Sequence, residues 1–177
     1  MEVRTAASPK DVKHYTTERL REEFLIQNLF QADEIKLVYS HIDRIITGAA
    51  VPVKQTLELK AGDELRAEYF LQRRELGLIN IGGDGVITVD GKTYEVCARE
   101  GMYIGRGSKN ITFASKDASN PAKFYMNSAP AHTTYPTVHT LSPKVRHSPV
   151  LSSSRTKTRS RPAAWKIATI ESSISIS

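Results

Sequence analysis

LGLINIGGDGVITVDGKTYEV, residues 76–96, is the stretch that decides the fold of this chain. Two runs rich in β-branched residues stand on either side of Asp90-Gly91. An Asp-Gly pair between such runs favours a two-residue hairpin turn, because both turn positions tolerate a positive φ. The apolar run 76–81 before them ends in a cluster of glycines, which predicts a strand followed by a turn.

Short strands are predicted on both sides of this hairpin. They are expected at 25–30, 34–39, 42–47, 53–59, 102–104, 111–113 and 123–126. Turn signals recur about every 8–12 residues, a spacing typical of an all-β sandwich or barrel. Upstream, Thr16 and Thr17 precede good helix formers and predict a short helix with Leu20 and Phe24 on one face.

The net charge of +6 comes entirely from the end of the chain. Residues 1–137 hold 18 basic and 18 acidic side chains, whereas 138–177 hold 7 basic ones and only Glu171. The body therefore has no electrostatic bias towards polyanions, and nucleic acid is not the expected partner. RNA binding through the charge of the tail alone stays open as a minor alternative.

The composition predicts three parts. Residues 1–23 form an arm with the short helix, 24–137 form the β domain, and 138–177 are a Ser- and Arg-rich tail expected to be disordered. No apolar run is long enough to span a membrane, and no signal-peptide core stands near the start, so a cytoplasmic protein is expected. The single Cys97 excludes an internal disulfide.

Glu75, the glycines at 82–85 and the later turn 101–107 resemble, in this order, the two motifs of the cupin fold. In a metal-bearing cupin, histidines on neighbouring strands converge with the glutamate on one ion. Here the run 69–72, Tyr-Phe-Leu-Gln, stands where the first two histidines would be, and Asn110 stands near the place of the last. We therefore expect a cupin-like antiparallel barrel or sandwich, with no metal ligands of its own.

Several adjoining motifs resemble one family in particular, the 4-deoxy-L-threo-5-hexosulose-uronate ketol-isomerases. These motifs are Tyr39–Arg44, Tyr69–Gly77, Ile79–Gly83, Thr88–Gly91, Pro121–Tyr125 and Ser128–Pro136. The resemblance implies the N-terminal half of a two-barrel enzyme of pectin and uronate breakdown. It implies the interconversion of 5-dehydro-4-deoxy-D-glucuronate and 3-deoxy-D-glycero-2,5-hexodiulosonate, by moving a proton between neighbouring carbons.

The resemblance also implies a cofactor and partners. Zinc is held by the second barrel in that family, the substrate is a small sugar acid, and the enzyme is a homo-oligomer. Nothing after Thr137 resembles the second barrel, so a truncated or frameshifted form that lacks the zinc-binding half is expected. The alternative is a catalytically inactive cupin-like module for binding or assembly.

Seven residues are candidates for a site. By the resemblance, the catalytic candidates are His41, Asp43, Glu75 and His132, and the candidates for binding the substrate carboxylate are Arg44, Arg73 and Arg74. Arginine suits a carboxylate because its guanidinium offers a bidentate fork. His41 and Asp43 alternate on a predicted strand and are expected to face one side. Structural roles stay open for all seven, and Tyr69, Phe70, Tyr103, Phe113, Phe124 and Tyr125 are expected in the core.

Overall fold

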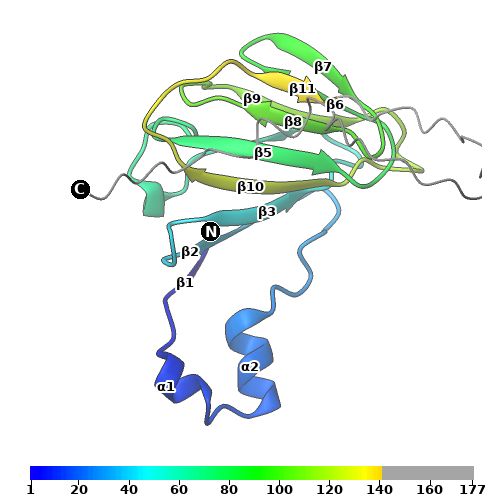
Figure 1. The fold of residues 1–177 in the computed structure, drawn as a ribbon. Helices are drawn as coiled ribbons and strands as arrows, with labels where there is room; N and C mark the ends of the chain where they lie inside the picture. The colour runs from blue at the N-terminus through cyan, green and yellow to red at the C-terminus, as the bar shows by residue number, and fades with distance from the viewer. Residues whose placement is uncertain (141–177) are drawn as a thin grey trace, which may run out of the picture. The chain divides into compact units, whose positions relative to one another are not determined.

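Two β-sheets face each other, because apolar side chains alternate with polar ones along most strands (Figure 1). The computed structural model describes residues 1–140. One sheet has seven strands in the order β1-β2-β3-β10-β5-β8-β11, and the other has four in the order β4-β9-β6-β7. The expected all-β class is confirmed, and the architecture is a sandwich. No helix within residues 1–140 has the length and apolar character needed to cross a membrane.

The elements are short and follow one another closely along the chain. Their bounds are β1 Glu2–Arg4, α1 Pro9–Val12, α2 Thr17–Phe24, β2 Ile35–Ser40, β3 Ile46–Ala50, β4 Leu57–Glu58, the 3-10 turn η1 Asp63–Leu65, β5 Arg74–Asn80, β6 Gly85–Val89, β7 Lys92–Val96, β8 Gly101–Ile104, β9 Ile111–Ser115, β10 Phe124–Pro130 and β11 Val138–Thr140.

The hairpin expected at Asp90-Gly91 is confirmed. Strands β6 and β7 pair antiparallel up to Val89 and Lys92, and the turn residues have φ values of 49° and 84°. A turn with both central residues at positive φ has the twist that the flanking strands require. The Asp90 carboxylate also accepts hydrogen bonds from the backbone N–H groups of Lys109 and Asn110, at 3.0 and 2.9 Å. The turn is therefore tied to the loop before β9.

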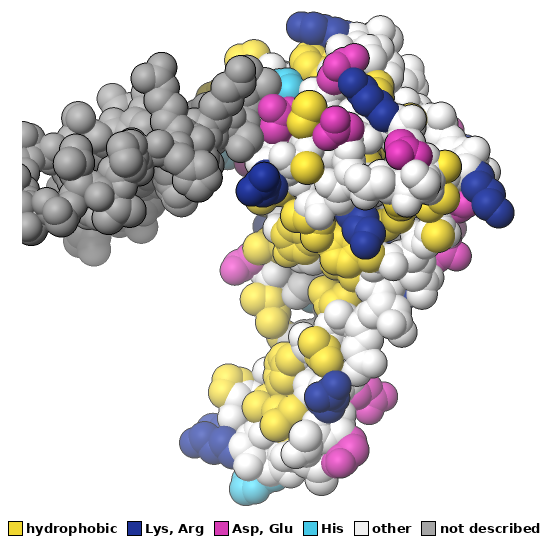
Figure 2. Space-filling model, turned by 90° about the vertical axis from the view of Figure 1, so that its right-hand side faces the viewer, with side chains coloured by type: hydrophobic (Ala, Val, Ile, Leu, Met, Phe, Trp, Pro, Cys, Tyr) yellow, Lys and Arg dark blue, Asp and Glu magenta, His cyan; other side chains and the backbone are white. Residues whose placement is uncertain are grey.

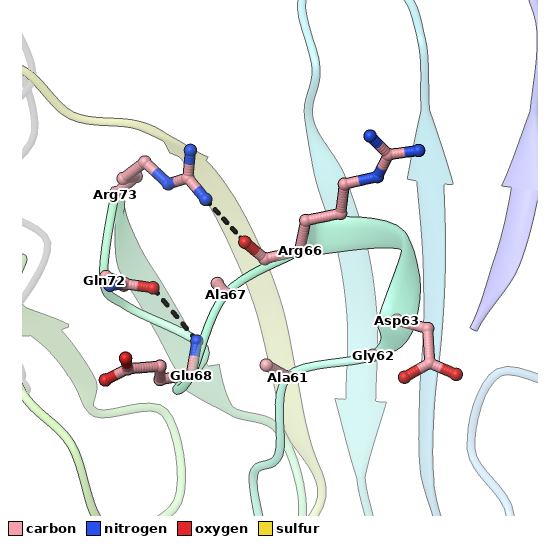
Figure 3. A pocket seen from close by; sticks show the side chains of 8 residues that line it. All are labelled: Ala61, Gly62, Asp63, Arg66, Ala67, Glu68, Gln72 and Arg73. Carbon is pink, nitrogen blue, oxygen red and sulfur yellow. Dashed lines mark hydrogen bonds between the residues drawn. The ribbon is translucent and has the colours of Figure 1, made fainter.

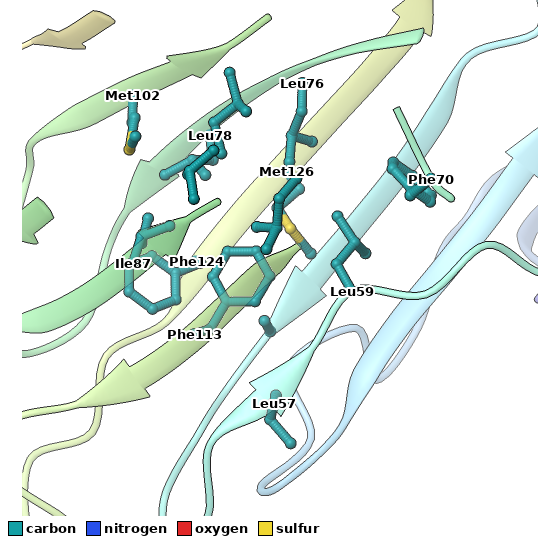
Figure 4. Close-up of a cluster of buried hydrophobic side chains, with 14 of the residues drawn as sticks. Leu57, Leu59, Phe70, Leu76, Leu78, Ile87, Met102, Phe113, Phe124 and Met126 are labelled. Atoms are coloured by element: carbon teal, nitrogen blue, oxygen red, sulfur yellow. The ribbon is translucent and has the colours of Figure 1, made fainter. Parts of the chain in front are cut away.

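The core lies between the two sheets and is apolar. Phe113 on β9 and Phe124 on β10 meet there from opposite sheets, with ring centroids 5.4 Å apart. Figure 4 shows them among other buried side chains, which include Leu57, Leu59, Phe70, Leu76, Leu78, Ile87, Met102 and Met126. Of the six aromatic residues expected in the core, Phe70, Phe113 and Phe124 are buried, whereas Tyr69, Tyr103 and Tyr125 are only half-buried.

Asn80, the last residue of β5, is a fully buried polar side chain. Its amide nitrogen donates to the carbonyl oxygens of Gly83 and Val96, at 2.7 and 2.9 Å. Its side-chain oxygen accepts from the backbone N–H groups of Gly82 and Lys123, at 3.1 and 3.2 Å. One side chain thus joins β5 to the end of β7, to the turn before β6 and to the entry into β10.

Two of the predicted strands do not form as expected near the start of the domain. Residues 25–30 are not a strand, because Asn28 has a positive φ of 54° and Lys36 holds the carbonyls of Gln27 and Asn28, at 3.3 and 3.2 Å. Of residues 53–59, only Leu57–Glu58 pairs. The reason is that the Asp33 carboxylate accepts three backbone N–H groups from residues 53–55, which holds this part as a loop.

Two other boundaries also differ from the prediction. The strand expected at 42–47 begins only at Ile46, because Asp43 and Arg44 adopt left-handed φ values of 52° and 54° in the β2–β3 turn. Val138–Thr140, expected within the disordered tail, forms β11 on the free edge of β8. The rest of the tail, 141–177, lies outside the described residues.

The segment after β1 that carries both helices, residues 5–30 and called the arm from here on, is held to the sandwich by β1. This strand pairs in parallel with β2, and the Arg4 guanidinium donates to the carbonyl oxygens of Glu23 and Leu25, both at 3.1 Å. The expected helix is confirmed as α2, and the Thr16 hydroxyl caps it by accepting from the Arg19 N–H. No residue of α2 is buried. Figure 2 shows hydrophobic side chains gathered on the arm, which forms the lower lobe.

Replacing Arg4 should loosen the arm. Arg4→Ala removes both contacts with the end of α2. The free energy needed to open the arm locally should therefore fall by about 1 kcal/mol. We expect tryptic cleavage after Arg21 to accelerate about fivefold, measured by mass spectrometry on the full chain under native conditions. Lys60→Ala, at an exposed ion pair away from the arm, is the control and should leave that rate unchanged. Equal rates for wild type and Arg4→Ala would contradict the anchoring role.

Replacing Asn80 should destabilise the whole sandwich. Asn80→Ala leaves buried backbone groups without partners, so the free energy of unfolding should fall by about 2–4 kcal/mol in urea titrations. Asn127→Ala on β10 is the matched control, because Asn127 is exposed and bonds only to the Thr47 hydroxyl, at 3.0 Å. The Asn127→Ala variant should lose less than about 1 kcal/mol of its free energy of unfolding. Equal losses for both variants would refute the linking role of Asn80.

Candidate functional site

Three chain segments that are distant in sequence meet at one end of the seven-stranded sheet. Strand register brings this about, because Ser128 near the end of β10 pairs with Ile46 at the start of β3 and with Leu76 near the start of β5. The β2–β3 turn, the residues before β5 and the segment after β10 therefore lie together. This end, called the Arg74 end below, holds every candidate residue except Glu75, whose side chain lies on the outer surface of the sheet.

Arg74 is the buried centre of this end, with 6% of its surface exposed. Its guanidinium donates to the Ser128 hydroxyl at 3.1 Å, to the Ser128 carbonyl at 2.8 Å and to the Arg44 carbonyl at 2.5 Å. It also lies 5.7 Å from the centre of the Tyr39 ring. Burial lowers the pKa of Arg74, while the Tyr39 hydroxyl opposes this effect. The contacts favour a structural role, in which Arg74 ties the β2–β3 turn to β5 and β10.

The β2–β3 turn carries three of the candidates. His41, Asp43 and Arg44 are all exposed and belong to the turn, so the expectation that His41 and Asp43 alternate on one strand is wrong. The left-handed backbone at Asp43 and Arg44 ends the extended pattern there. The His41 ring packs at a tilt against Tyr39, with centroids 5.2 Å apart. Tyr39 thus connects His41 with the buried guanidinium of Arg74.

An open pocket of about 470 Å³ lies beside η1 and the loop before β5 (Figure 3). It is lined by Ala61, Gly62, Asp63, Arg66, Ala67, Glu68, Gln72 and Arg73. The Arg73 guanidinium donates to the Arg66 carbonyl at 2.6 Å, and the Gln72 side chain accepts from the Glu68 N–H at 3.0 Å. Two guanidinium groups and two carboxylates balance in charge. The pocket therefore suits a small polar molecule.

Glu75 faces the opposite way from Arg74, because successive side chains of β5 alternate. The Tyr103 hydroxyl on β8 donates to the Glu75 carboxylate at 2.8 Å. Burial, followed by this bond to Glu75, raises the pKa of Tyr103, so the phenol stays protonated and remains a donor. Sequence reasoning missed this partner. The bond depends on the pairing of β5 with β8, which residue spacing does not indicate.

His132 is exposed in the segment between β10 and β11. Arg106 fixes the backbone just before it, donating to the Ala131 carbonyl at 3.0 Å and to the Gln72 carbonyl at 3.2 Å. Within residues 1–140, no hydrogen bond links any two of the catalytic candidates, which are His41, Asp43, Glu75 and His132. The structure therefore does not assemble these four side chains into a proton relay.

The residues present do not fit a zinc ion. Among residues 1–140, no group of three or more His, Cys, Asp or Glu side chains is placed to hold a metal. Phe70 and Leu71, which stand where the cupin resemblance would put histidines, are buried in the core. Three of the four histidines of this part are exposed, and the half-buried His139 bonds to Glu100 at 3.1 Å. A zinc ion would need ligands from outside this part of the chain.

Known proteins resemble this chain over most of its length. A 4-deoxy-L-threo-5-hexosulose-uronate ketol-isomerase of Lachnoclostridium phytofermentans is 77% identical over 138 residues, which is 78% of this chain and 50% of the relative. Proteins of the same name from Lachnospira eligens and Escherichia coli are 62% and 54% identical, over 49% and 50% of their lengths. The chain thus spans about half the length of these curated relatives.

Solved structures show a weaker likeness. A cupin protein from Desulfovibrio desulfuricans aligns with 59% of this chain and 92% of its own length, at 15% identity and a TM-score of 0.42. The KduI/IolB family model, in contrast, matches residues 24–157, well over half of the sequence. From this match and from the identities above, the chain belongs to the KduI/IolB family.

Proposed function

We propose that this chain supplies the metal-free half of a 4-deoxy-L-threo-5-hexosulose-uronate ketol-isomerase. The observation that carries the proposal is the 77% identity to a protein of that name, over half of that relative's length. The reaction would interconvert 5-dehydro-4-deoxy-D-glucuronate and 3-deoxy-D-glycero-2,5-hexodiulosonate, as part of pectin and uronate breakdown. Zinc would be held by the other half, because the side chains of residues 1–140 do not fit it.

The substrate class is a sugar acid, and its carboxylate needs a cationic partner. We propose that Arg44 and Arg73, whose side chains are exposed at the Arg74 end, attract and orient this carboxylate. Arg74 would act differently from the other two, because its guanidinium is buried against the carbonyls of Arg44 and Ser128. It would fix the turn that carries Arg44 without touching the substrate.

An isomerisation of this type needs a side chain that moves a proton between neighbouring carbons. His41 and His132 are exposed at the Arg74 end and are the imidazoles available there, with Asp43 in the same turn as His41. Glu75 is the weakest of the four candidates, because Tyr103 already holds its carboxylate on the other surface. These residues would contribute to an active centre whose zinc ligands come from the other half of the enzyme. The assembled enzyme would be a homo-oligomer.

Complementation tests this function directly. We expect the 177-residue chain alone, supplied with zinc, to leave the keto-uronate unchanged. Co-expressed with the remaining half of the Lachnoclostridium phytofermentans relative, it should give zinc-dependent isomerisation, measured by chromatography of substrate and product. The remaining half expressed without this chain is the control, and it should show at least tenfold less activity.

Two results would contradict the proposal. Turnover by the purified 177-residue chain alone would show that it is not a metal-free half. A stable complex of the two halves without turnover would favour the alternative, a catalytically inactive module for assembly.

Removing one arginine should weaken substrate binding in the complemented enzyme. Arg73→Ala should raise KM about tenfold and change kcat little, because the lost contact acts equally on bound substrate and transition state. Lys92→Ala, on the hairpin of the four-stranded sheet, is the matched control and should change neither constant. A fall in kcat at constant KM for Arg73→Ala would oppose a binding role.

A further inference from the structure

The outer face of the seven-stranded sheet, meaning the side turned away from the core, exposes unusual side chains. Strand β5 places Glu75, Gly77 and Ile79 on this face, and Ile79 and the following Ile81 are 50% and 55% exposed. Antiparallel sheets often have one polar face towards water, with hydrophobic side chains only towards the core. Half-exposed isoleucines on β5 and directly after it, beside the central strand β10, are therefore a feature that the fold of residues 1–140 does not itself require.

Gly77 is the second such feature. It lies in the middle of β5 and is exposed, between Tyr103 on β8 and Asn127 on β10. A Cβ atom added there would meet nothing closer than the Asn127 carbonyl oxygen, at 3.9 Å. No contact within the described chain requires a glycine, although a glycine inside a strand weakens that strand. The absence of a side chain leaves room there for a close approach by other protein atoms.

The polar side chains around Gly77 are already fixed. Tyr103 donates to Glu75 on one side, and the Thr47 hydroxyl and Asn127 side chain share a hydrogen bond on the other, at 2.8 and 3.0 Å. A glycine with exposed isoleucines beside it and fixed polar groups around it matches the make-up of protein interfaces. The same groups are poorly suited to a small-molecule site, which is concave.

We infer that this outer face is where the other half of the isomerase docks, with its closest approach over Gly77. The inference rests on the proposed function. Two observations identify the occupant. The relatives are about twice as long as the stretch that matches this chain, so a second half of similar size has to be accommodated. Strand β11, the last described element, pairs with β8 of this same sheet, so the chain leaves the described part at this sheet (Figure 1).

The test uses the full 177-residue chain co-expressed with the remaining half of the Lachnoclostridium phytofermentans relative. Gly77→Val should weaken the complex at least tenfold, measured by Kd in pull-down titrations, because its side chain fills the space of closest approach. The melting temperature of the variant should not fall, since an added Cβ meets nothing closer than 3.9 Å and a β-branched side chain suits a strand. Ile79→Lys should weaken the complex to a similar degree. Thr93→Lys, exposed on β7 of the other sheet, is the matched control and should bind like wild type.

The outcomes separate this inference from the proposed function. If wild type forms an active complex and Gly77→Val and Ile79→Lys bind equally well, the docking face is overturned and the function stands. If wild type forms a Gly77-dependent complex without turnover, the function fails and the docking face stands. If the 177-residue chain pairs only with itself, and Gly77→Val abolishes this pairing, a second copy occupies the face and the inference is overturned.

Discussion

The buried amide of Asn80 is the interaction on which the arrangement of the two sheets depends most directly. It satisfies two carbonyls and two N–H groups from three other segments, and its bonds to the two carbonyls are buried. Within residues 1–140, no deeply buried side-chain nitrogen or oxygen lacks a partner. A buried polar group stabilises a fold only when its bonds are made, so Asn80 specifies one relative position of β5, β7 and β10.

Strand β5 also carries a buried, fully bonded polar side chain at its other end, Arg74. Its inward-facing side chains are Arg74, Leu76, Leu78 and Asn80, which are polar at both ends and apolar between them. The two leucines fill the core, while Arg74 and Asn80 bind the backbones of the turns that close the sandwich at either end. The outward-facing side chains of the same strand are Glu75, Gly77 and Ile79. One strand therefore organises the core on one side and offers a contact surface on the other.

Much of the fold could be predicted because its signals are local. The Asp90-Gly91 turn, the strands around it and the Thr16-capped helix follow from short-range backbone preferences. The failures at 25–30 and 53–59 have another origin. In both places a distant side chain, Lys36 or Asp33, captures backbone groups that a strand would have used. Such long-range competition leaves no mark on local periodicity.

The candidate site was less predictable than the fold. The sequence could mark the arginines as candidates for binding a carboxylate, but the burial of Arg74 depends on the pairing of β10 with both β3 and β5. The bond between Tyr103 and Glu75 and the open space over Gly77 likewise depend on register. Register is set by the whole sheet. The Tyr103–Glu75 bond and the space over Gly77 could therefore not be predicted from residue spacing.

Strands β1 and β11, the two outermost strands of the large sheet, are only three residues long. Long, regular outer strands invite lateral growth, in which another chain continues the hydrogen-bond ladder and aggregates form. Here an added strand could form only a few hydrogen bonds with the described residues of β1 or β11. Along its described residues, the large sheet is therefore protected against lateral growth at both of its edges.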